Sequence, residues 1–259
     1  MKHILITNDD GYNAPGILAL IEALRPLADI TVVAPSTEKS ACGHSLTLTR
    51  PLNFIQVEKN FYKLDDGTPT DCIFLALNKL FDAAHKPDLV ISGINIGSNM
   101  GEDITYSGTA SAAMEAVLHG IPAIAISQVY ANGRESIKEH GYALAQQSIV
   151  TLVKKIFSGA YPLPERKFIN VNIPALLPKA CKGFKATRAG NKIYSFDAEV
   201  HYNPRGVEYY WIGLPNLNWL PTPGDTTDFE AINDGYVSLT PIQLDMTSYD
   251  DIHTLQAWI

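Results

Sequence analysis

The chain has 259 residues, of which 46% are hydrophobic and 18% are charged, and its formal net charge is −7 at pH 7. These proportions are typical of a globular protein and exclude an intrinsically disordered one. The acidic balance, with no cluster of Lys and Arg, disfavours binding to a nucleic-acid polymer. Positive charge for a phosphate ligand would then come from another source, and a metal ion is the simplest one.

The first third of the chain predicts a β-α-β unit. Residues 4–7 form a short apolar strand, and the next helix is expected to begin at Pro15, a residue suited to a first helical turn. Apolar residues then recur at the helical spacing of three and four positions: Ile17, Leu20, Ile21, Leu24 and Leu27. Residues 29–34 predict a second strand that ends at Pro35.

The middle of the chain repeats this alternation of strands and helices. The expected helices are 70–81, 109–119 and 136–157, and the expected strands are 89–92, 123–127 and 167–172. Thr70 is the expected N-cap of the first of these helices. Short apolar strands that alternate with amphipathic helices predict an α/β fold, a parallel sheet with helices on both faces.

The last third has a different character. Residues 185–213 are rich in Tyr, Asn and charged residues and predict an extended β-hairpin excursion. A strand at 236–240 and a terminal helix from about Ser248 follow. We expect one domain overall, with a catalytic core over residues 1–180 and, over 181–259, a C-terminal hairpin arm that returns to the core and serves oligomerisation.

Neither a membrane anchor nor a disulfide framework is expected. The apolar stretch after Gly16 is broken by Glu22 and Arg25, short of the ~20 apolar residues of a membrane span. The first strand follows the N-terminus with no secretory signal before it, so we expect a cytoplasmic protein. The three cysteines are widely spaced and form no Cys-x-x-Cys pair: Cys42, Cys72 and Cys181.

Ligands in open α/β sheets bind beyond the carboxyl ends of the strands. The first strand ends in Asn8-Asp9-Asp10-Gly11. Adjacent carboxylates repel each other unless a cation or hydrogen-bond donors lie between them, and Mg²⁺ and Mn²⁺ prefer such oxygen ligands. The segment fits a metal site and fits equally a strand-to-helix turn whose side chains satisfy backbone donors.

Two further polar loops follow later strands. The loop over 35–47 contains several hydroxyls, including Ser40, which suit a cation or a phosphate but also an ordinary solvated loop. The loop from Gly93 to Gly108 contains Asn95 and Asn99 and ends at Ser107-Gly108-Thr109, at the start of a helix. Backbone N–H groups and the helix dipole favour an anion there, although Ser107 or Thr109 could simply cap the helix.

Together the three loops predict one crevice with an oxygen-lined cation site beside an anion site, an arrangement suited to hydrolysis of a phosphate monoester. The sequence contains no Gly-x-x-x-x-Gly-Lys phosphate loop, no Gly-x-Gly-x-x-Gly after the first strand and no Gly-x-Ser-x-Gly elbow. Two other classes stay open: a nucleotide sensor without catalysis, and a metal-dependent transferase that acts on a nucleotide sugar.

The order of these motifs resembles the SurE family, the survival-protein-E nucleotidases, over essentially the whole chain. The shared segments are Asn8-Asp9-Asp10-Gly11, Ala14-Pro15-Gly16, Ala34-Pro35 with Ser40, Ser45-Leu46-Thr47, Gly67-Thr68-Pro69-Thr70-Asp71-Cys72, Ser92-Gly93-Ile94-Asn95-Ile96-Gly97-Ser98-Asn99, Tyr106-Ser107-Gly108-Thr109, Ala112-Ala113-Met114-Glu115, Thr227-Asp228 and Gly235-Tyr236-Val237-Ser238-Leu239-Thr240-Pro241.

The resemblance implies a Rossmann-like, three-layer core and a metal-dependent 5′/3′-nucleotidase that hydrolyses nucleoside monophosphates and, in some members, short polyphosphate. It implies one divalent ion per subunit, Mg²⁺ or Mn²⁺. The implied metal ligands are Asp9, Asp10, Ser40 and Asn95, with Asp9 and Asp10 also the catalytic residues, and the implied phosphate neighbours are Asn99, Ser107, Gly108 and Thr109. The implied partners are small nucleotides and other copies of the chain, in a homodimer or homotetramer that exchanges C-terminal elements.

The chain departs from the family pattern directly after Ser40. The family usually has Gly there, and this chain has Ala41, followed by Cys42 and His44 where small or amide residues are usual. Because Ala adopts a positive φ less easily than Gly, we expect the path of the loop near Ser40 to differ.

Overall fold

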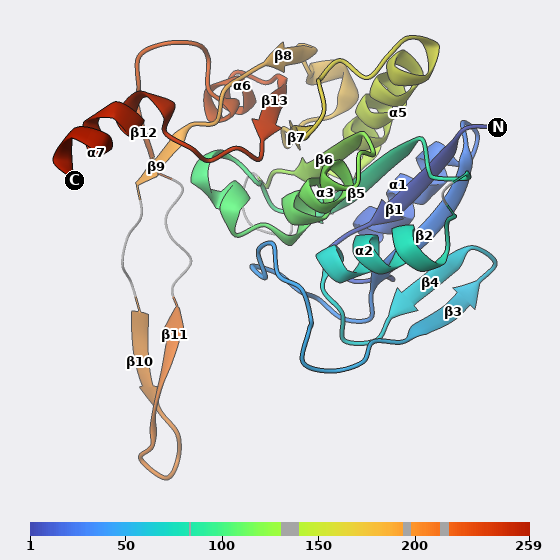
Figure 1. Cartoon of the computed structure of the whole chain (residues 1–259), viewed down its shortest axis with the longest axis horizontal. Coiled ribbons are helices and arrows are strands. Elements are labelled where there is room, and N and C mark those ends of the chain that lie inside the picture. Colours follow the sequence, from blue (N-terminus) through green and yellow to red (C-terminus); the bar gives the residue numbers. More distant parts are fainter. Residues whose placement is uncertain (83, 131–139, 194–197, 213–217) are drawn as a thin grey trace.

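The structure is a computed structural model that describes residues 1–259 except residue 83 and segments 131–139, 194–197 and 213–217 (Figure 1). Nine strands form one sheet: β1 (His3–Thr7), β2 (Asp29–Pro35), β3 (Phe54–Glu58), β4 (Phe61–Leu64), β5 (Leu89–Ile96), β6 (Ala123–Gln128), β7 (Lys167–Ile173), β8 (Phe184–Ala186) and β13 (Val237–Gln243). Their order across the sheet is β3-β4-β2-β1-β5-β6-β7-β13-β8.

Most neighbouring strands are parallel, which confirms the expected α/β class. The run from β4 through β2, β1, β5 and β6 to β7 pairs in parallel throughout. Two pairs are antiparallel, β3 with β4 and β13 with β7. The β3–β4 hairpin was not predicted. Only Lys59 and Asn60 lie between these strands, and so short a connection permits antiparallel pairing alone.

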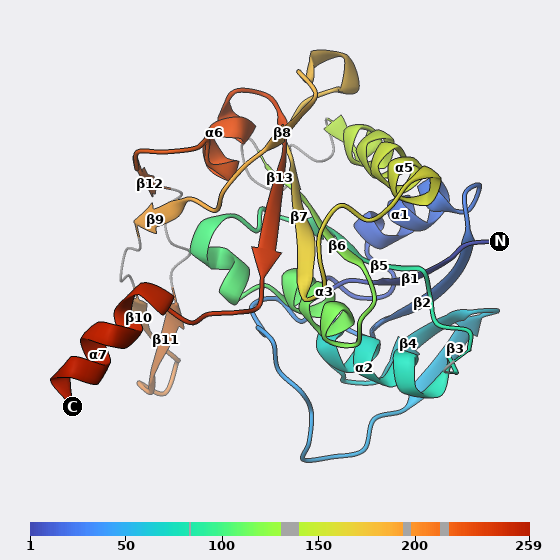
Figure 2. The ribbon, with the colours of Figure 1, turned by 45° about the horizontal axis from the view of Figure 1, so that its top comes forward.

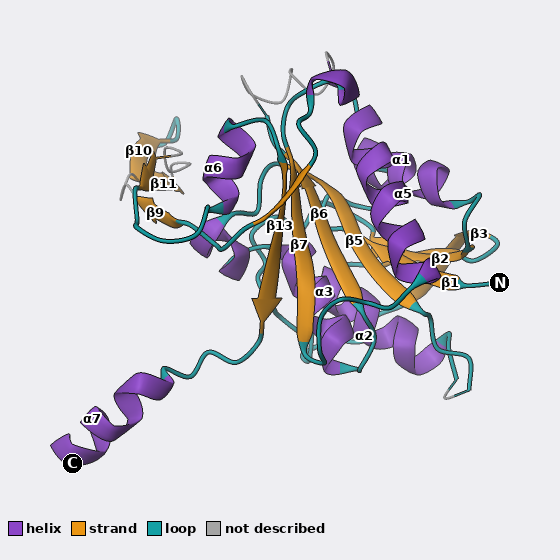
Figure 3. Ribbon diagram, turned by 90° about the horizontal axis from the view of Figure 1, so that it is seen from above, coloured by secondary structure: helices purple, strands orange, loops and turns teal. Residues whose placement is uncertain are grey.

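Helices cover both faces of the sheet and give the expected three layers (Figure 3). The helices α1 (Pro15–Leu24) and α5 (Ala143–Ser158) cover one face, and α2 (Pro69–Lys79) and α3 (Gly108–Leu118) cover the other. Strand β1 shows why both faces are apolar. Ile4 and Ile6 belong to the core under α1 and α5, and Leu5 belongs to the core under α2 and α3, because successive side chains alternate between faces.

The helix boundaries follow the sequence with one correction. The expectation that Thr70 caps α2 was wrong. The hydroxyl of Thr68 accepts a hydrogen bond from the N–H of Asp71 at 3.0 Å, and the Asp71 carboxylate accepts one from the N–H of Thr68 at 2.9 Å. This reciprocal capping box requires an acidic or amide side chain three positions after the cap, which Thr68 has. For the helix expected over 136–157, residues 136–139 lie outside the described part, and α5 covers the rest of it from Ala143.

The strand expected to end at Ser92 continues as β5 to Ile96, so the expectation of a loop from Gly93 was wrong. Beyond a register shift after Ser92, Asn95 pairs with Ser127 and Ile96 pairs with Gln128 of β6. Asn95 is therefore paired within the sheet and does not lie in a loop.

The C-terminal third forms the expected hairpin excursion and then returns to the sheet. Its further elements are β9 (Asn191–Ile193), β10 (Ala198–Tyr202), β11 (Glu208–Ile212), β12 (Asn218–Leu220), α6 (Asp228–Asn233) and α7 (Ile252–Trp258). The antiparallel pair β10–β11 projects away from the sheet (Figure 1). Strand β13 returns beside β7, and α7 then leaves the body of the protein (Figure 2).

Three short 3₁₀ helices complete the described part: η1 (Gly101–Thr105), η2 (Pro178–Ala180) and η3 (Tyr249–Asp251). Across the described residues, every helix is too short or too polar to cross a membrane.

The first turn of α1 packs so closely on β5 that Gly16 has no room for a side chain. A Cβ at this position would overlap the carbonyl oxygen of Ile94. We therefore expect Gly16→Ala to lower the free energy of unfolding by about 2–3 kcal/mol through overpacking. Urea unfolding followed by circular dichroism measures this change.

Gly120 provides the matched control, because it has φ +75° and no atom near a Cβ. Gly120→Ala should cost only about 1 kcal/mol, from the left-handed backbone. Equal losses in the two variants would contradict the steric explanation.

Candidate functional site

The end of β1 and the start of α3 meet through Asp9 and Thr109. The hydroxyl of Thr109 donates to Oδ1 of Asp9 at 2.5 Å, and the N–H of Thr109 donates to Oδ2 at 3.1 Å. Asp9 is 4% exposed and Thr109 is fully buried. The structure thus brings together two predicted site residues that are 100 positions apart in the chain.

Gly108 lies directly against this contact. A Cβ on Gly108 would lie 3.0 Å from Oδ2 of Asp9 and 3.0 Å from Sγ of Cys42. Glycine is therefore the residue that lets the helix start approach the Asp9 carboxylate. Cys42, which was not among the predicted site residues, flanks the same point.

Asp10 bonds the backbone of β5, the strand next to β1, at the residue that follows Asn95. Oδ2 of Asp10 accepts a hydrogen bond from the N–H of Ile96 at 3.0 Å, next to Asn95. The Nδ2 group of Asn95 donates to the carbonyl of Gly97 at 2.8 Å, so the amide oxygen of Asn95 is left as an acceptor. Both predicted ligands therefore lie at the carboxyl end of adjacent strands, β1 and β5.

Ser40 belongs to the loop that follows β2, and this loop touches the end of β1. The N–H of Lys39 donates to the carbonyl of Asp9 at 2.7 Å, and the hydroxyl of Ser40 donates to Glu38 at 2.8 Å. Ala41 adopts φ +56°, the left-handed conformation that Gly adopts without strain. The loop thus takes a glycine-like backbone at Ala41, at a cost of roughly 1–2 kcal/mol.

The start of α3 is capped by Ser107. Its hydroxyl accepts from the N–H of Ala110 at 2.9 Å, and its carbonyl accepts from the N–H of Ser111 at 3.1 Å. The N–H of Thr109 donates to the Asp9 carboxylate. Among the described residues, the first-turn donor that remains without a hydrogen bond is the N–H of Gly108.

Asn99 points into the protein and fixes the loop after β5. Its Nδ2 group donates to the hydroxyl of Ser127 at 2.8 Å, and its N–H donates to Asn172 at 2.9 Å. Its carbonyl accepts from the side chains of Asn170 and Asn172. Sequence reasoning missed these partners. The signal was the Asn-x-Asn spacing in β7, which places both amides on one face of the strand.

The site concentrates negative charge in a buried position. Burial raises the pKa of Asp9 above its ordinary value, although hydrogen bonds from Thr109 act in the opposite direction, and the charge of Glu38 raises it further. Burial and the charge of Asp9 raise the pKa of Cys42 to about 11. A buried carboxylate without an opposite charge is unfavourable, so this position suits a cation.

The donors at this position fit a hard divalent cation. Asp9, Asp10 and Asn95 offer carboxylate and amide oxygens, the ligands that Mg²⁺ and Mn²⁺ prefer. Over the described ranges, no group of three or more His, Cys, Asp or Glu could hold a metal ion. A cation at this position would therefore take neutral oxygens beside the two carboxylates. Asn8 adds a buried amide oxygen that has no hydrogen-bond partner.

Comparison with known proteins gives matches along the whole chain. The family model described as Survival protein SurE matches residues 4–196. The chain is 72% identical to the 5′-nucleotidase SurE of Sulfurovum sp. (strain NBC37-1), covering 100% of this chain and 98% of that protein. It is 55% identical to the 5′-nucleotidase SurE of Helicobacter hepaticus, covering 100% and 99%. The crystal structure of the SurE protein from Aquifex aeolicus superposes with a TM-score of 0.83 at 41% identity, covering 99% of both chains.

The raised pKa of Asp9 makes the stability of the metal-free protein depend on pH. Between the ordinary value of 3.8 and the raised value, the folded protein binds more protons than the unfolded protein, so its stability falls as the pH rises. Asp9→Asn removes the carboxyl group and with it this fall in stability. We expect the stability of the variant relative to wild type to increase as the pH rises through this window, measured by urea unfolding in EDTA.

Asp66 serves as the control because its shift has the opposite sign. A hydrogen bond from Lys39 lowers the pKa of this exposed carboxylate. Its stabilising contribution is therefore present above pH 3.8 and lost as the pH falls. Asp66→Asn should become less stable relative to wild type as the pH rises toward 3.8, and a rising relative stability would contradict the assignment.

Proposed function

The chain belongs to the survival protein SurE family, and from this premise we propose that it is a 5′-nucleotidase that hydrolyses nucleoside 5′-monophosphates to a nucleoside and inorganic phosphate. The names of the relatives that match it over its full length support this activity. The observation that carries the proposal is the contact between Asp9 and the start of α3. It places a buried carboxylate, which suits a cation, beside a helix N-terminus, which suits a phosphate. Activity on 3′-monophosphates and short polyphosphate stays a prediction, as does a cytoplasmic location.

We further propose that the activity depends on one divalent metal ion per subunit, Mg²⁺ or Mn²⁺. Asp9, Asp10 and Asn95 would hold the ion, and Ser40 would complete the ligand set from the loop after β2. The ion, when bound, would withdraw charge from the phosphoryl oxygens. The burial of Asp9 supports this assignment, because the cation relieves the cost of a charged side chain at that position.

The start of α3 would hold the phosphate on the side away from the metal ion. The N–H of Gly108 is available for a phosphoryl oxygen, and the positive end of the α3 dipole favours the anion. Ser107, Thr109 and Asn99 act mainly on the protein itself: they cap the helix, bind Asp9 and fix the loop after β5. This division of roles refines the expectation that all four contact the phosphate.

Phosphate release from AMP tests the proposed activity. With Mn²⁺ we expect release that EDTA abolishes. Asp9→Asn should reduce the rate at saturating Mn²⁺ by at least about 100-fold, which corresponds to about 2.7 kcal/mol of barrier. Asp82→Asn changes an exposed carboxylate that pairs with His85 beyond the end of α2, and this variant should retain the wild-type rate.

The same assay separates the other two classes. A nucleotide sensor would bind AMP and release no phosphate. A transferase would release none unless an activated sugar donor were present. Full activity of Asp9→Asn would remove Asp9 from the site.

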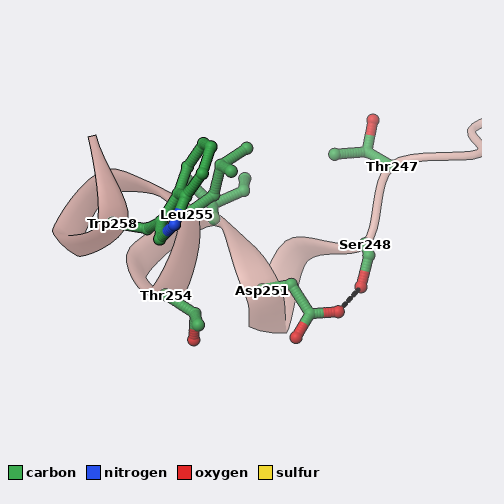
Figure 4. Close-up of a pocket in the computed structure, with 7 residues that line it drawn as sticks. Thr247, Ser248, Asp251, Thr254, Leu255 and Trp258 are labelled. Carbon is green, nitrogen blue, oxygen red and sulfur yellow. Dashed lines mark hydrogen bonds between the residues drawn. The ribbon is translucent and has the colours of Figure 1, made fainter.

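We also propose that the C-terminal arm joins copies of the chain in a homodimer or homotetramer. The hairpin exposes Tyr210, Trp211 and Ile212, with Ile212 90% exposed. Leu255 and Trp258 lie on one side of α7 and line a shallow apolar depression (Figure 4). Such a concentration of exposed apolar side chains on two projecting elements is typical of a protein–protein interface.

Light scattering coupled to gel filtration tests the role of α7. We expect the double change Leu255→Ser and Trp258→Ser to lower the measured mass, because it removes apolar area from the contact. Leu18→Ser on α1, which is 47% exposed and away from the arm, is the control and should leave the mass unchanged. A wild-type protein of monomer mass would exclude the assembly.

A further inference from the structure

The loop after β2 carries a side chain that reaches a buried acid on α3. Nε2 of His44 lies 2.9 Å from Oε2 of Glu115. The Glu115 side chain is 8% exposed, and its other oxygen lies 3.0 Å from Nε2 of His119. Burial alone would raise the pKa of Glu115, but the hydrogen bonds and charges of the two histidines hold it below its ordinary value. Glu115 is therefore an ionised acceptor, and both histidines donate to it.

The segment just before His44 forms a wall of the candidate site. The Cys42 thiol and the Asp9 carboxylate flank the same point above Gly108. The N–H of Gly43 donates to the carbonyl of Tyr106 at 3.0 Å, one residue before the cap of α3. Ser40 and Ala41 are exposed. This segment also contains Ala41 at φ +56°, a left-handed conformation that costs roughly 1–2 kcal/mol, so contacts with the rest of the protein help to hold it. Lys39 supplies one such contact through its ion pair with Asp66 at 2.6 Å.

We propose that His44 is a positioning residue that fastens the segment 39–43 to α3 through Glu115 and so sets Ser40 and Cys42 relative to Asp9. The proposal deepens the proposed function and rests on it, since the metal ion is the ligand whose binding the segment would affect. Glu115 lies six positions after Thr109 in α3, about 9 Å along the axis, so His44 acts through the loop and not on the phosphate.

The two histidines on Glu115 provide a matched pair of variants. His119 lies on α3 itself, four positions after Glu115, and its bond attaches no loop. His44→Ala and His119→Ala each remove one hydrogen bond from Glu115 and leave the other in place. The buried carboxylate therefore keeps a partner in both variants, and only His44→Ala removes a bond that joins the loop to α3.

The first measurement is the dissociation constant of Mn²⁺ by titration calorimetry, without nucleotide. We expect His44→Ala to weaken Mn²⁺ binding about tenfold, the usual effect of losing a group that orients a metal ligand. His119→Ala should bind Mn²⁺ as wild type does. His44→Gln, which places an amide N–H within reach of Glu115, should restore affinity to within about threefold. Equal losses in the two alanine variants, or wild-type affinity in His44→Ala, would overturn the proposal.

The second measurement does not depend on the metal. Hydrogen exchange of the Gly43 amide in EDTA should be at least about tenfold faster in His44→Ala and unchanged in His119→Ala, because this amide reports whether the loop stays on α3. If His44→Ala does not fold, His44→Asn, which is too short to reach Glu115, replaces it. Unchanged exchange would overturn the proposal, and so would faster exchange with wild-type Mn²⁺ affinity.

These measurements separate the two proposals. A wild-type protein that binds no Mn²⁺ and releases no phosphate from AMP would refute the proposed function and, with it, the effect on the metal. A wild-type protein that does both, with no difference between the alanine variants, would refute the role of His44 alone.

Discussion

Two hydrogen bonds from Thr109 to the Asp9 carboxylate join the end of β1 to the start of α3, and the rest of the site is arranged around this junction. Hydrogen bonds to a charged group are worth roughly 1.5–3 kcal/mol, and these two lie in the interior, where they are screened least. The same bonds satisfy a buried acid and orient a helix N-terminus. Gly108 makes the junction possible because any side chain there would collide with Asp9.

The junction also creates an electrostatic conflict that the fold does not resolve alone. Burial raises the pKa of Asp9, the charge of Glu38 raises it further, and the charge of Asp9 adds to the effect of burial in raising the pKa of Cys42. A helix N-terminus offers only about half a positive charge to this region. In the proposed metal site a bound cation would complete the balance, so the burial that disfavours a charged Asp9 in the metal-free protein would also favour metal binding. Opposition between stability and function is common at such sites.

Contacts from the C-terminal third stabilise the loops around the junction. The buried Asp228 carboxylate accepts the N–H of Gly101, the first residue of η1, at 2.9 Å. It also accepts the N–H of Gly190, at the base of the arm, at 3.0 Å. Lys192, also at that base, lies 2.5 Å from Asp103 of η1. The arm is therefore attached to the segment that leads into α3, and the site depends on residues from nearly the whole chain.

Local pattern was sufficient for most elements of the fold and for the choice of candidate site residues at the strand ends. The periodicity of apolar residues, Pro15 and the adjacent acids Asp9 and Asp10 all act over a few positions. The sequence by itself therefore determined the α/β alternation and the helix starts near the strand ends, and it singled out the acidic turn after β1 as a candidate cation site. Tertiary structure alone decided that Asp9 meets Thr109, that β5 extends to Asn95, and that Glu38, Cys42 and Asn172 lie around the candidate site. These pairings join residues far apart in the chain, and local spacing carries no information about which distant partner satisfies a buried polar group.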